Sequence, residues 1–364
     1  MRIMLIPALD SANSDPSHDE GCRDAALELA RGGHQVTLVY LQPDAEQGLR
    51  TEKRREDGVE EHILHYKRSF LGLEQRRLNQ ALLQMIRSLP GNLRPEVVHV
   101  HSRRMMRFAL SAKRRFRIPF VVTMHPGAGD AGEGELRSVS PVFQRAGEVV
   151  AASAGMKELV QPLCPGEVTV IPDPVAERFF LAPLPREEPG SFAFITADSP
   201  DNGLDAVLSA FSYAAAYCPE ITLTVMGGRH EYTEKQAAAL GLSDKIRFAG
   251  DVGRESYVRL LSAHRAMVSG SRGEVSGAIL AEALACGLPI AMTRTVSWRE
   301  LINMGTGLAV PADDTHALGG AMVRLAQYSE DYDAAEIRAY AAGVFSPEAV
   351  CRRLTEVYIA AGER

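Results

Sequence analysis

The sequence has few cysteines, and none of them are paired in a motif. Five cysteines occur in 364 residues, and they lie far apart: Cys22, Cys164, Cys218, Cys286 and Cys351. Because no C-x-x-C pair is present, the pattern predicts neither a zinc site nor a disulfide framework. This use of cysteine is typical of a reducing compartment, so we expect a cytoplasmic protein.

Long apolar runs are also missing. No stretch approaches the length of a membrane span, and residues 1–7 lack the apolar core and cleavage site of a signal peptide. Hydrophobic residues make up 46% of the sequence and charged residues 24%, which is ordinary for a soluble globular protein. The length is sufficient for two domains, each with its own core.

Short apolar runs alternate with helical patterns along the first half of the sequence. Residues 2–7 read as a buried strand, 21–32 as a helix and 34–40 as a second strand, which together form a βαβ unit. Further strands are expected at 62–66, 97–101, 119–125, 149–153 and 168–172, with helices at 70–89 and 103–116. We expect residues 42–61 to form an acidic linker, apart from the strand that begins at 62.

The same alternation restarts after a proline-containing segment. Residues 177–190 read as irregular chain, and we place the linker itself at 183–190. The predicted domains are therefore 1–182 plus 347–364, and 191–346. Strands are expected at 191–196, 221–226, 245–249, 266–269, 290–292 and 307–310, with helices at 204–216, 257–263, 276–286 and 347–361. The fold class is α/β, with two doubly wound Rossmann-like domains facing across a cleft.

One stretch of the second half combines two carboxylates with a helix start. Glu274 lies in a loop of small residues, a helix opens at Ser276 and Gly277, and Glu282 lies in its second turn. The N-terminus of such a helix has free N–H groups and a positive dipole end, so it is suited to an anion. Two glutamates beside an anion site would each need a separate partner.

These residues belong to a set of ordered motifs that covers nearly the whole sequence. Residues 274–289 read EVSGAILAEALACGLP, and the other motifs are RGGHQVT (31–37), VVHVHS (97–102), VTMH (122–125), ASAGMK (152–157), VIP (170–172), FAG (248–250) and GTGLAVPAD (305–313). In this set the chain resembles the retaining glycosyltransferases of GT-B fold that carry an E-x7-E motif, the group 1 or family 4 glycosyltransferases. The resemblance implies transfer of a hexosyl group from a nucleotide sugar to a glycan, lipid or small acceptor.

The resemblance also implies roles for particular residues. Glu282 would bind the donor ribose, Glu274 and His125 would act at the transferred sugar, and Gly227 would line the donor site. The N–H groups of Ser276, Gly277 and Ala278 would face the diphosphate. His101 and Gly21 would lie on the acceptor side, and no metal or other cofactor is expected. His99 and His101 share one strand face, and we interpret them as a core-facing or backbone-satisfied pair, with His101 nearer the cleft.

Three stretches depart from the family pattern. Ala197 and Asn202 stand where relatives have an Arg and a Lys, and IPDP at 171–174 replaces IPNG. Arg272, on a neighbouring loop, is a candidate replacement cation. The first βα loop offers only Gly21 instead of paired glycines. The alternative function is therefore a catalytically silent relative that binds a sugar, nucleotide or protein. A third possibility is another GT-B activity such as epimerisation.

Positive charge is concentrated between residues 67 and 117. This segment holds thirteen Lys or Arg against two acids, in a chain whose net charge is −6. One interpretation is a solvated face balanced by the acidic residues 44–61. The other is a surface for anionic lipid or a phosphate-bearing acceptor, which would make the protein peripheral at the inner membrane face. Few aromatic residues accompany the charge, so nucleic acid is not expected as a partner.

Overall fold

The computed structural model describes most of the chain in a set of ranges. These ranges are 1–7, 20–44, 49–67, 73–101, 103–125, 133–185, 190–196, 203–228, 231–271, 277–294, 298 and 301–363. Several residues named by the sequence analysis lie outside them: Ala197, Asn202, Arg272, Glu274 and Ser276.

The chain forms two compact units. The first contains Met1–Ala176 with Pro347–Arg364, and the second contains Glu177–Ser346. The first boundary therefore precedes the predicted position at 182. The reason is the short helix α6 (Glu177–Leu181), whose Phe179 side chain is 1% exposed. The carbonyl of Phe179 also lies 3.8 Å from the thiol of Cys286, so this part of the predicted irregular segment belongs to the second unit.

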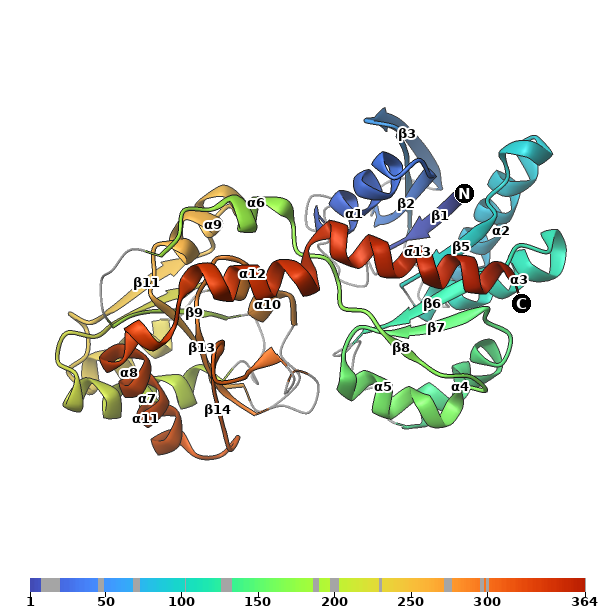
Figure 1. Cartoon of the computed structure of the whole chain (residues 1–364). Helices are drawn as coiled ribbons and strands as arrows, with labels where there is room; N and C mark the ends of the chain where they lie inside the picture. The colour runs from blue at the N-terminus through green and yellow to red at the C-terminus, as the bar shows by residue number, and fades with distance from the viewer. Residues whose placement is uncertain are drawn as a thin grey trace. The chain divides into compact units, whose positions relative to one another are not determined.

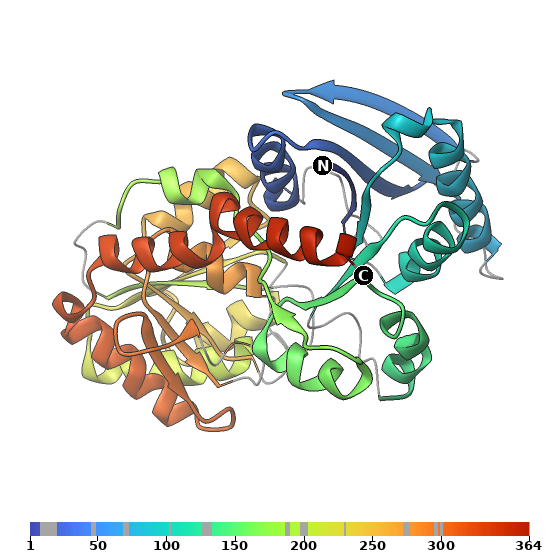
Figure 2. The same ribbon diagram turned by 45° about the vertical axis from the view of Figure 1, so that its right-hand side comes forward.

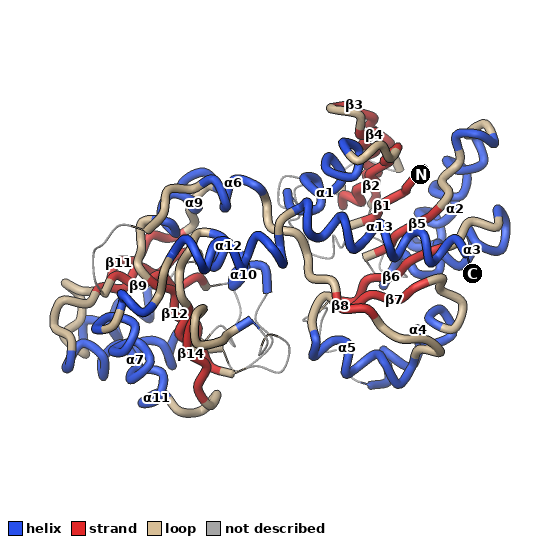
Figure 3. Tube along the Cα trace, in the orientation of Figure 1, coloured by secondary structure: helices blue, strands red, loops and turns tan. Residues whose placement is uncertain are grey.

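The first unit is built on an eight-stranded sheet in the order β3-β4-β2-β1-β5-β6-β7-β8 (Figure 3). All neighbours are parallel except β3 and β4. The strands are β1 (Arg2–Ile6), β2 (Gln35–Pro43), β3 (Arg50–Glu56), β4 (Val59–Tyr66), β5 (Val97–Val100), β6 (Phe120–Met124), β7 (Glu148–Ala151) and β8 (Thr169–Val170). The central strands are buried and mostly apolar, as a parallel sheet covered on both faces requires.

Helices cover both faces of this sheet. On one face, α1 (Glu20–Arg31) and α13 (Pro347–Glu363) share a core with Leu5 and Val121. On the other, α2 (Leu73–Ser88), α3 (Met106–Phe116), α4 (Glu133–Phe143) and α5 (Ala154–Val160) enclose a second core that includes Phe120. Figure 2 shows α13 lying against the middle strands of the first unit. The last helix of the chain thus completes the first unit.

The expectation of an irregular linker at 42–61 is wrong. Strands β3 and β4 form an antiparallel hairpin, joined at Asp57 and Gly58, whose φ angles are 47° and 87°. Asp-Gly with both φ angles positive is the preferred pairing of a two-residue hairpin turn. Charged residues fill β3 because it is an exposed edge strand, where charge discourages pairing with another sheet. The high charge concealed the strand in the sequence.

The second unit is a six-stranded parallel sheet in the order β11-β10-β9-β12-β13-β14. Its strands are β9 (Ser191–Ile195), β10 (Thr222–Met226), β11 (Ile246–Gly250), β12 (Ala266–Ser269), β13 (Ile290–Thr293) and β14 (Gly307–Val310). Its helices are α7 (Leu204–Tyr217), α8 (Glu231–Ala239), α9 (Arg254–Ser262), α10 (Gly277–Ala285), α11 (Thr315–Gln327) and α12 (Ala334–Phe345) (Figure 1). Helices α8, α11 and α12 were not predicted from the sequence. No helix among the described residues is long and apolar enough to cross a membrane.

The start of α10 is held by close packing against an aromatic ring. Gly277, its first residue, is buried, and a Cβ added there would overlap the indole of Trp298. At the other end, the helix is followed by Gly287 with φ of 84°, the left-handed conformation of a helix C-cap. Glycine at 277 therefore sets how closely the N-terminus of α10 approaches Trp298.

We predict that Gly277→Ala lowers the free energy of unfolding by about 1–3 kcal/mol, because the added methyl group overpacks the contact with Trp298. Gly320→Ala is the matched control in the same unit. It lies in α11 with nothing within 4 Å of an added Cβ, so this change should stabilise by about 0.5–1 kcal/mol. Urea unfolding measures both, and equal effects would contradict the role assigned to Trp298.

Candidate functional site

In the first unit, three polar side chains meet at the carboxyl edge of the sheet. His101 directly follows β5, His125 directly follows β6, and Asp173 lies three residues beyond β8. The backbone N–H of His101 donates to the carbonyl of Ile6 at 3.0 Å, which continues the pairing with β1. Because parallel strands end at one edge, residues far apart in the sequence converge there.

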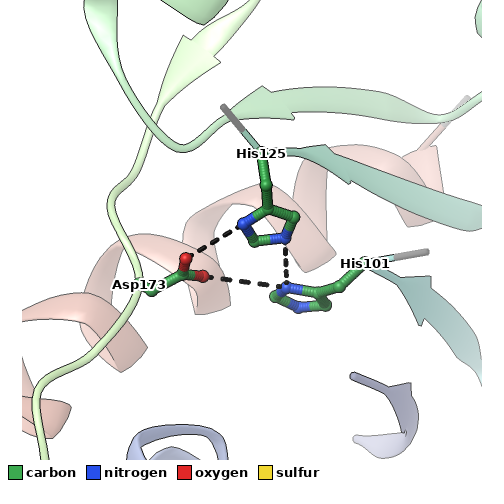
Figure 4. A group of neighbouring side chains, drawn as sticks. All are labelled: His101, His125 and Asp173. Carbon is green, nitrogen blue, oxygen red and sulfur yellow. Dashed lines mark hydrogen bonds and ion pairs between the residues drawn. The ribbon is translucent and has the colours of Figure 1, made fainter. Parts of the chain in front are cut away.

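The three side chains form a chain of short contacts (Figure 4). Nδ1 of His125 lies 2.9 Å from Oδ2 of Asp173, and Nε2 of His125 lies 3.1 Å from Nδ1 of His101. Nδ1 of His101 is 3.9 Å from Oδ1 of Asp173. The two imidazoles are stacked with ring centroids 5.2 Å apart. His125 is therefore the middle member of an Asp173–His125–His101 chain.

Burial and charge set the protonation states in this chain. Burial is the main cause that lowers the pKa of His101 well below its usual value, with His99 and His125 adding repulsion. For Asp173, desolvation opposes ionisation, but the charge and hydrogen bond of His125, helped by His101, outweigh it and lower the pKa. In the folded protein His101 is therefore neutral and Asp173 is ionised.

His99 lies beside this chain and belongs to the core. Its ring is fully buried, with Nδ1 2.8 Å from the hydroxyl of Tyr358 on α13 and Nε2 2.7 Å from Oγ1 of Thr123 on β6. The rings of His99 and His101 lie 4.2 Å apart, which confirms that they share a face. The pair is not satisfied by backbone, however: the ring contacts of both histidines are to side chains.

Gly21 has a packing role that its sequence position did not reveal. It is the second residue of α1, and a Cβ there would overlap the carbonyl of Pro174. The start of α1 thus packs directly against the turn that carries Asp173. The structure places Gly21 near the candidate site as a close backbone contact of Pro174.

The same three side chains are the described residues whose ligand atoms could share a metal ion. One ligand atom each from His101, His125 and Asp173 lies within 4.8 Å of the others. Two imidazole nitrogens and a carboxylate are ligands typical of zinc and similar transition metals. The sequence pattern did not indicate that these three side chains meet, because His101 and His125 are 24 residues apart and His125 and Asp173 are 48 residues apart.

In the second unit, Glu282 lies on α10, the helix that follows β12 at the carboxyl edge of the sheet. Its carboxylate accepts a hydrogen bond from the hydroxyl of Tyr257 on α9 at 2.7 Å, and its side chain is half-buried. Tyr257 in turn packs edge-on against Phe179, with ring centroids 5.9 Å apart. Tyr257 therefore fixes the direction of the Glu282 carboxylate, a contact that sequence spacing did not indicate.

The N-terminus of α10 presents backbone N–H groups near this edge. Gly277 is buried and Ala278 is exposed, and the first N–H groups of a helix have no intrahelical acceptor. Ser271 is tied to β13, because the hydroxyl of Thr293 donates to its carbonyl at 2.5 Å. The structure thus places Gly277, Ala278 and Glu282 on one helix.

Gly227 is required by the backbone at the end of β10. Its φ angle is 90°, and a Cβ there would overlap the carbonyl of Thr196. Its N–H donates to the carbonyl of Gly250 at 2.7 Å, while the N–H of Gly228 donates to Asp251 at 2.9 Å. These contacts give Gly227 a role in the turn at the carboxyl edge of the second sheet.

Each half of the chain matches a glycosyltransferase family. Residues 21–178 match the model of Glycosyltransferase Family 4, and residues 191–328 match that of Glycosyl transferases group 1. The chain belongs to the GT-B glycosyltransferases. The matched residues include His101, His125 and Asp173 in the first model and Glu282 in the second.

Curated relatives of the glycosyltransferase chain are similar over different parts of its length. Glycogen synthase from Mycobacterium tuberculosis is 28% identical over 297 residues, which is 74% of this chain and 70% of the relative. Phosphatidyl-myo-inositol mannosyltransferase from Mycobacterium leprae is 32% identical over 133 residues, 35% of this chain and 34% of the relative.

Solved structures share the fold of this glycosyltransferase along its length. Sucrose-phosphate synthase from Thermosynechococcus elongatus has a TM-score of 0.78 at 17% identity, covering 98% of both chains. HepE from Anabaena in complex with UDP has a TM-score of 0.73 at 15% identity, covering 99% of this chain and 100% of that one. The expected α/β class with two doubly wound units is confirmed.

We predict that the stability of the first unit falls in acid partly because of His99. Burial, followed by repulsion from His125, lowers the pKa of His99 from its ordinary value of 6.5 to about 3 in the folded protein. Its contribution is therefore complete above pH 6.5 and is lost as the pH falls toward 3, because the unfolded chain binds a proton first.

Gln at position 99 cannot bind the proton that His99 binds in the unfolded chain. Between pH 6 and pH 5 the free energy of unfolding of the variant should decline less steeply than that of the wild type, by up to about 1.4 kcal/mol per pH unit. Urea unfolding of both proteins at several pH values measures this difference. Parallel curves for the two proteins would contradict the assigned protonation state.

Proposed function

We propose that this glycosyltransferase moves a hexosyl group from a nucleoside-diphosphate sugar to a hydroxyl of a glycan, lipid or small molecule, with retention of configuration. The observation that carries the proposal is the placement of Glu282 on α10, at the carboxyl edge of the parallel sheet within the group 1 match. Ligands of open α/β sheets bind at that edge, where helix N-termini converge.

The donor would lie against the second unit. An ionised carboxylate accepts well from two vicinal hydroxyls, so Glu282, held by Tyr257, is suited to the donor ribose. The diphosphate would lie at the N–H groups of Gly277, Ala278 and Ser276, where the helix dipole favours negative charge. HepE from Anabaena, a structural neighbour, has been solved with UDP and with UDP-glucose.

Transfer breaks the bond between the sugar C1 and the diphosphate oxygen and forms a bond from C1 to the acceptor oxygen on the same face. Positive charge develops on the sugar ring and negative charge on the leaving diphosphate. We assign Glu274 to the hydroxyls of the transferred sugar, and we assign the Asp173–His125–His101 chain that contains His125 to the reacting end of the donor. No metal ion or other cofactor is assigned a part in this proposal.

The sequence departures bear on the charge available to the diphosphate. The family resemblance leads us to expect an Arg and a Lys where this chain has Ala197 and Asn202, and a charge-assisted hydrogen bond contributes about 1.5–3 kcal/mol. We propose that Arg272, with the dipole of α10, supplies part of the missing stabilisation. Arg272→Ala should therefore weaken donor binding.

We predict that Glu282→Gln weakens donor binding about ten-fold or more, because the ribose loses its charged acceptor. The assay is a thermal-shift titration with UDP, GDP and ADP and with their glucose or mannose conjugates. Glu255→Gln, which changes an exposed carboxylate on the neighbouring helix α9, is the matched control and should leave the affinity unchanged.

The same titration separates the enzyme from its alternative. A shift with a nucleotide sugar, lost in Glu282→Gln and kept in Glu255→Gln, supports donor binding. If no nucleotide shifts the wild-type protein, the catalytically silent alternative is favoured. Product analysis with the donor that binds then determines the anomeric configuration and so tests retention.

A second proposal concerns anionic membranes. Helices α2 and α3 pack together in the first unit, and their exposed basic residues, with those adjoining α3, are Arg76, Arg77, Arg87, Arg104, Arg107, Arg114, Arg115 and Arg117. Three acidic residues of β3 and β4 are paired outside this surface: Glu56 and Glu61 pair with Arg23, and Glu52 pairs with Arg50. We propose that the α2–α3 surface binds anionic lipid headgroups.

We predict that the double variant Arg114→Glu/Arg115→Glu has an affinity for vesicles containing phosphatidylserine that is lower by about thirty-fold or more, since each basic residue contributes about 1 kcal/mol at such a surface. Sedimentation with the vesicles measures this affinity. The control is Arg31→Glu/Arg352→Glu, which makes the same charge change on α1 and α13 of the same unit. Equal recovery with neutral and anionic vesicles would show that the surface is only solvated.

A further inference from the structure

The Asp173–His125–His101 chain has a direction that its hydrogen bonds determine. An ionised carboxylate can only accept, so the contact of 2.9 Å between Asp173 and His125 places a proton on Nδ1 of His125. When the imidazole of His125 is neutral, its Nε2 is then an acceptor. In this neutral form the contact of 3.1 Å between Nε2 of His125 and Nδ1 of His101 requires His101 to donate from Nδ1. A doubly protonated His125 would donate from Nε2 and leave the proton of His101 on its own Nε2.

These bonds leave one nitrogen at the end of the chain. With a proton on Nδ1, a neutral His101 carries a lone pair on Nε2. This atom is buried and has no hydrogen-bond partner among the described residues, and the His101 residue is only 9% exposed. The neighbouring His99 differs, because both of its ring nitrogens have partners.

A buried acceptor without a partner costs free energy, so its retention in a defined orientation points to a ligand group. Asp173 fixes the tautomer of His125, and His125 fixes that of His101. Pro174 next to Asp173 is packed against Gly21, which holds the carboxylate end of the chain in place. The fixed orientation of Nε2 is thus the product of contacts from three separate segments.

We propose that Nε2 of His101 accepts a hydrogen bond from a substrate hydroxyl, with His125 and Asp173 as positioning residues. A hydroxyl group fits because it donates, whereas a phosphate oxygen would face a lone pair backed by the negative charge of Asp173. This inference rests on the proposed glycosyl transfer. It assigns the ring nitrogen that faces the substrate hydroxyl to His101 instead of His125. The hydroxyl belongs either to the donor sugar or to the acceptor.

The first test needs no activity. Nitrogen-15 NMR of histidine-labelled protein reports which ring nitrogen is protonated. We expect His101 and His125 both to carry the proton on Nδ1, and we expect Asp173→Asn to release this preference because the amide can donate as well as accept. A proton on Nε2 of His101 in the free protein would overturn the proposal. One equivalent of tightly bound metal that is lost in Asp173→Asn would also overturn it.

The second test compares His101→Gln with His101→Phe. Gln retains an acceptor oxygen on a flexible side chain, whereas Phe fills the space without one. We expect Phe to lower kcat/KM at least ten-fold and Gln to restore most of the loss, with little change in the unfolding midpoint between the two variants. Equal kinetics of the two variants would overturn the proposal.

The two sources of the hydroxyl give different results. A weaker thermal shift with UDP-glucose in His101→Phe identifies the donor sugar. An unchanged donor shift with a raised KM for glycogen or for phosphatidylinositol vesicles identifies the acceptor. If no nucleotide sugar binds the wild type, the proposed function fails. The nitrogen-15 signal of His101 is then measured during titration with glucose, mannose and myo-inositol instead. No response to any of the three would then overturn this inference separately.

Discussion

Both candidate sites depend on the pairing of parallel strands. In each unit the strands, apart from β3, run the same way, so their carboxyl ends form one edge, and the loops and helix starts that follow gather there. In the first unit this brings together His101, His125 and Asp173, and in the second it places α10 beside the end of β12. The register of these pairings decides which side chains can touch.

The elements could be predicted from the sequence where local pattern was sufficient. Buried strands such as β1 and β6 are short apolar runs, and α10 follows a loop of small residues and ends at a glycine. The pattern failed at β3, where nearly every side chain is exposed and charge replaces the apolar alternation of a half-buried strand. It also failed at α6, where three prolines nearby concealed a helix that buries Phe179.

The candidate site was predictable only in part, because its contacts are long-range. The histidines after β5 and β6 were identifiable from the motifs that contain them, and Glu282 from its spacing and sequence context. Asp173 and Tyr257 were not, because each acts through a residue on another element, 48 residues away for His125 and 25 for Glu282. Such pairs follow from strand register and helix packing, which a single sequence does not determine.

The structure changes the meaning of the IPDP sequence at 171–174, where the family resemblance leads us to expect IPNG. In the sequence it exchanged a flexible residue for a rigid one. In the structure both substituted positions have partners in the first unit: Asp173 binds His125, and Pro174 packs on Gly21. An Asn at 173 could donate or accept and would leave the tautomer of His125 open, whereas a carboxylate can only accept. The departure therefore adds a fixed charge and a fixed backbone at the same point, and together these orient the histidines at the edge of the sheet.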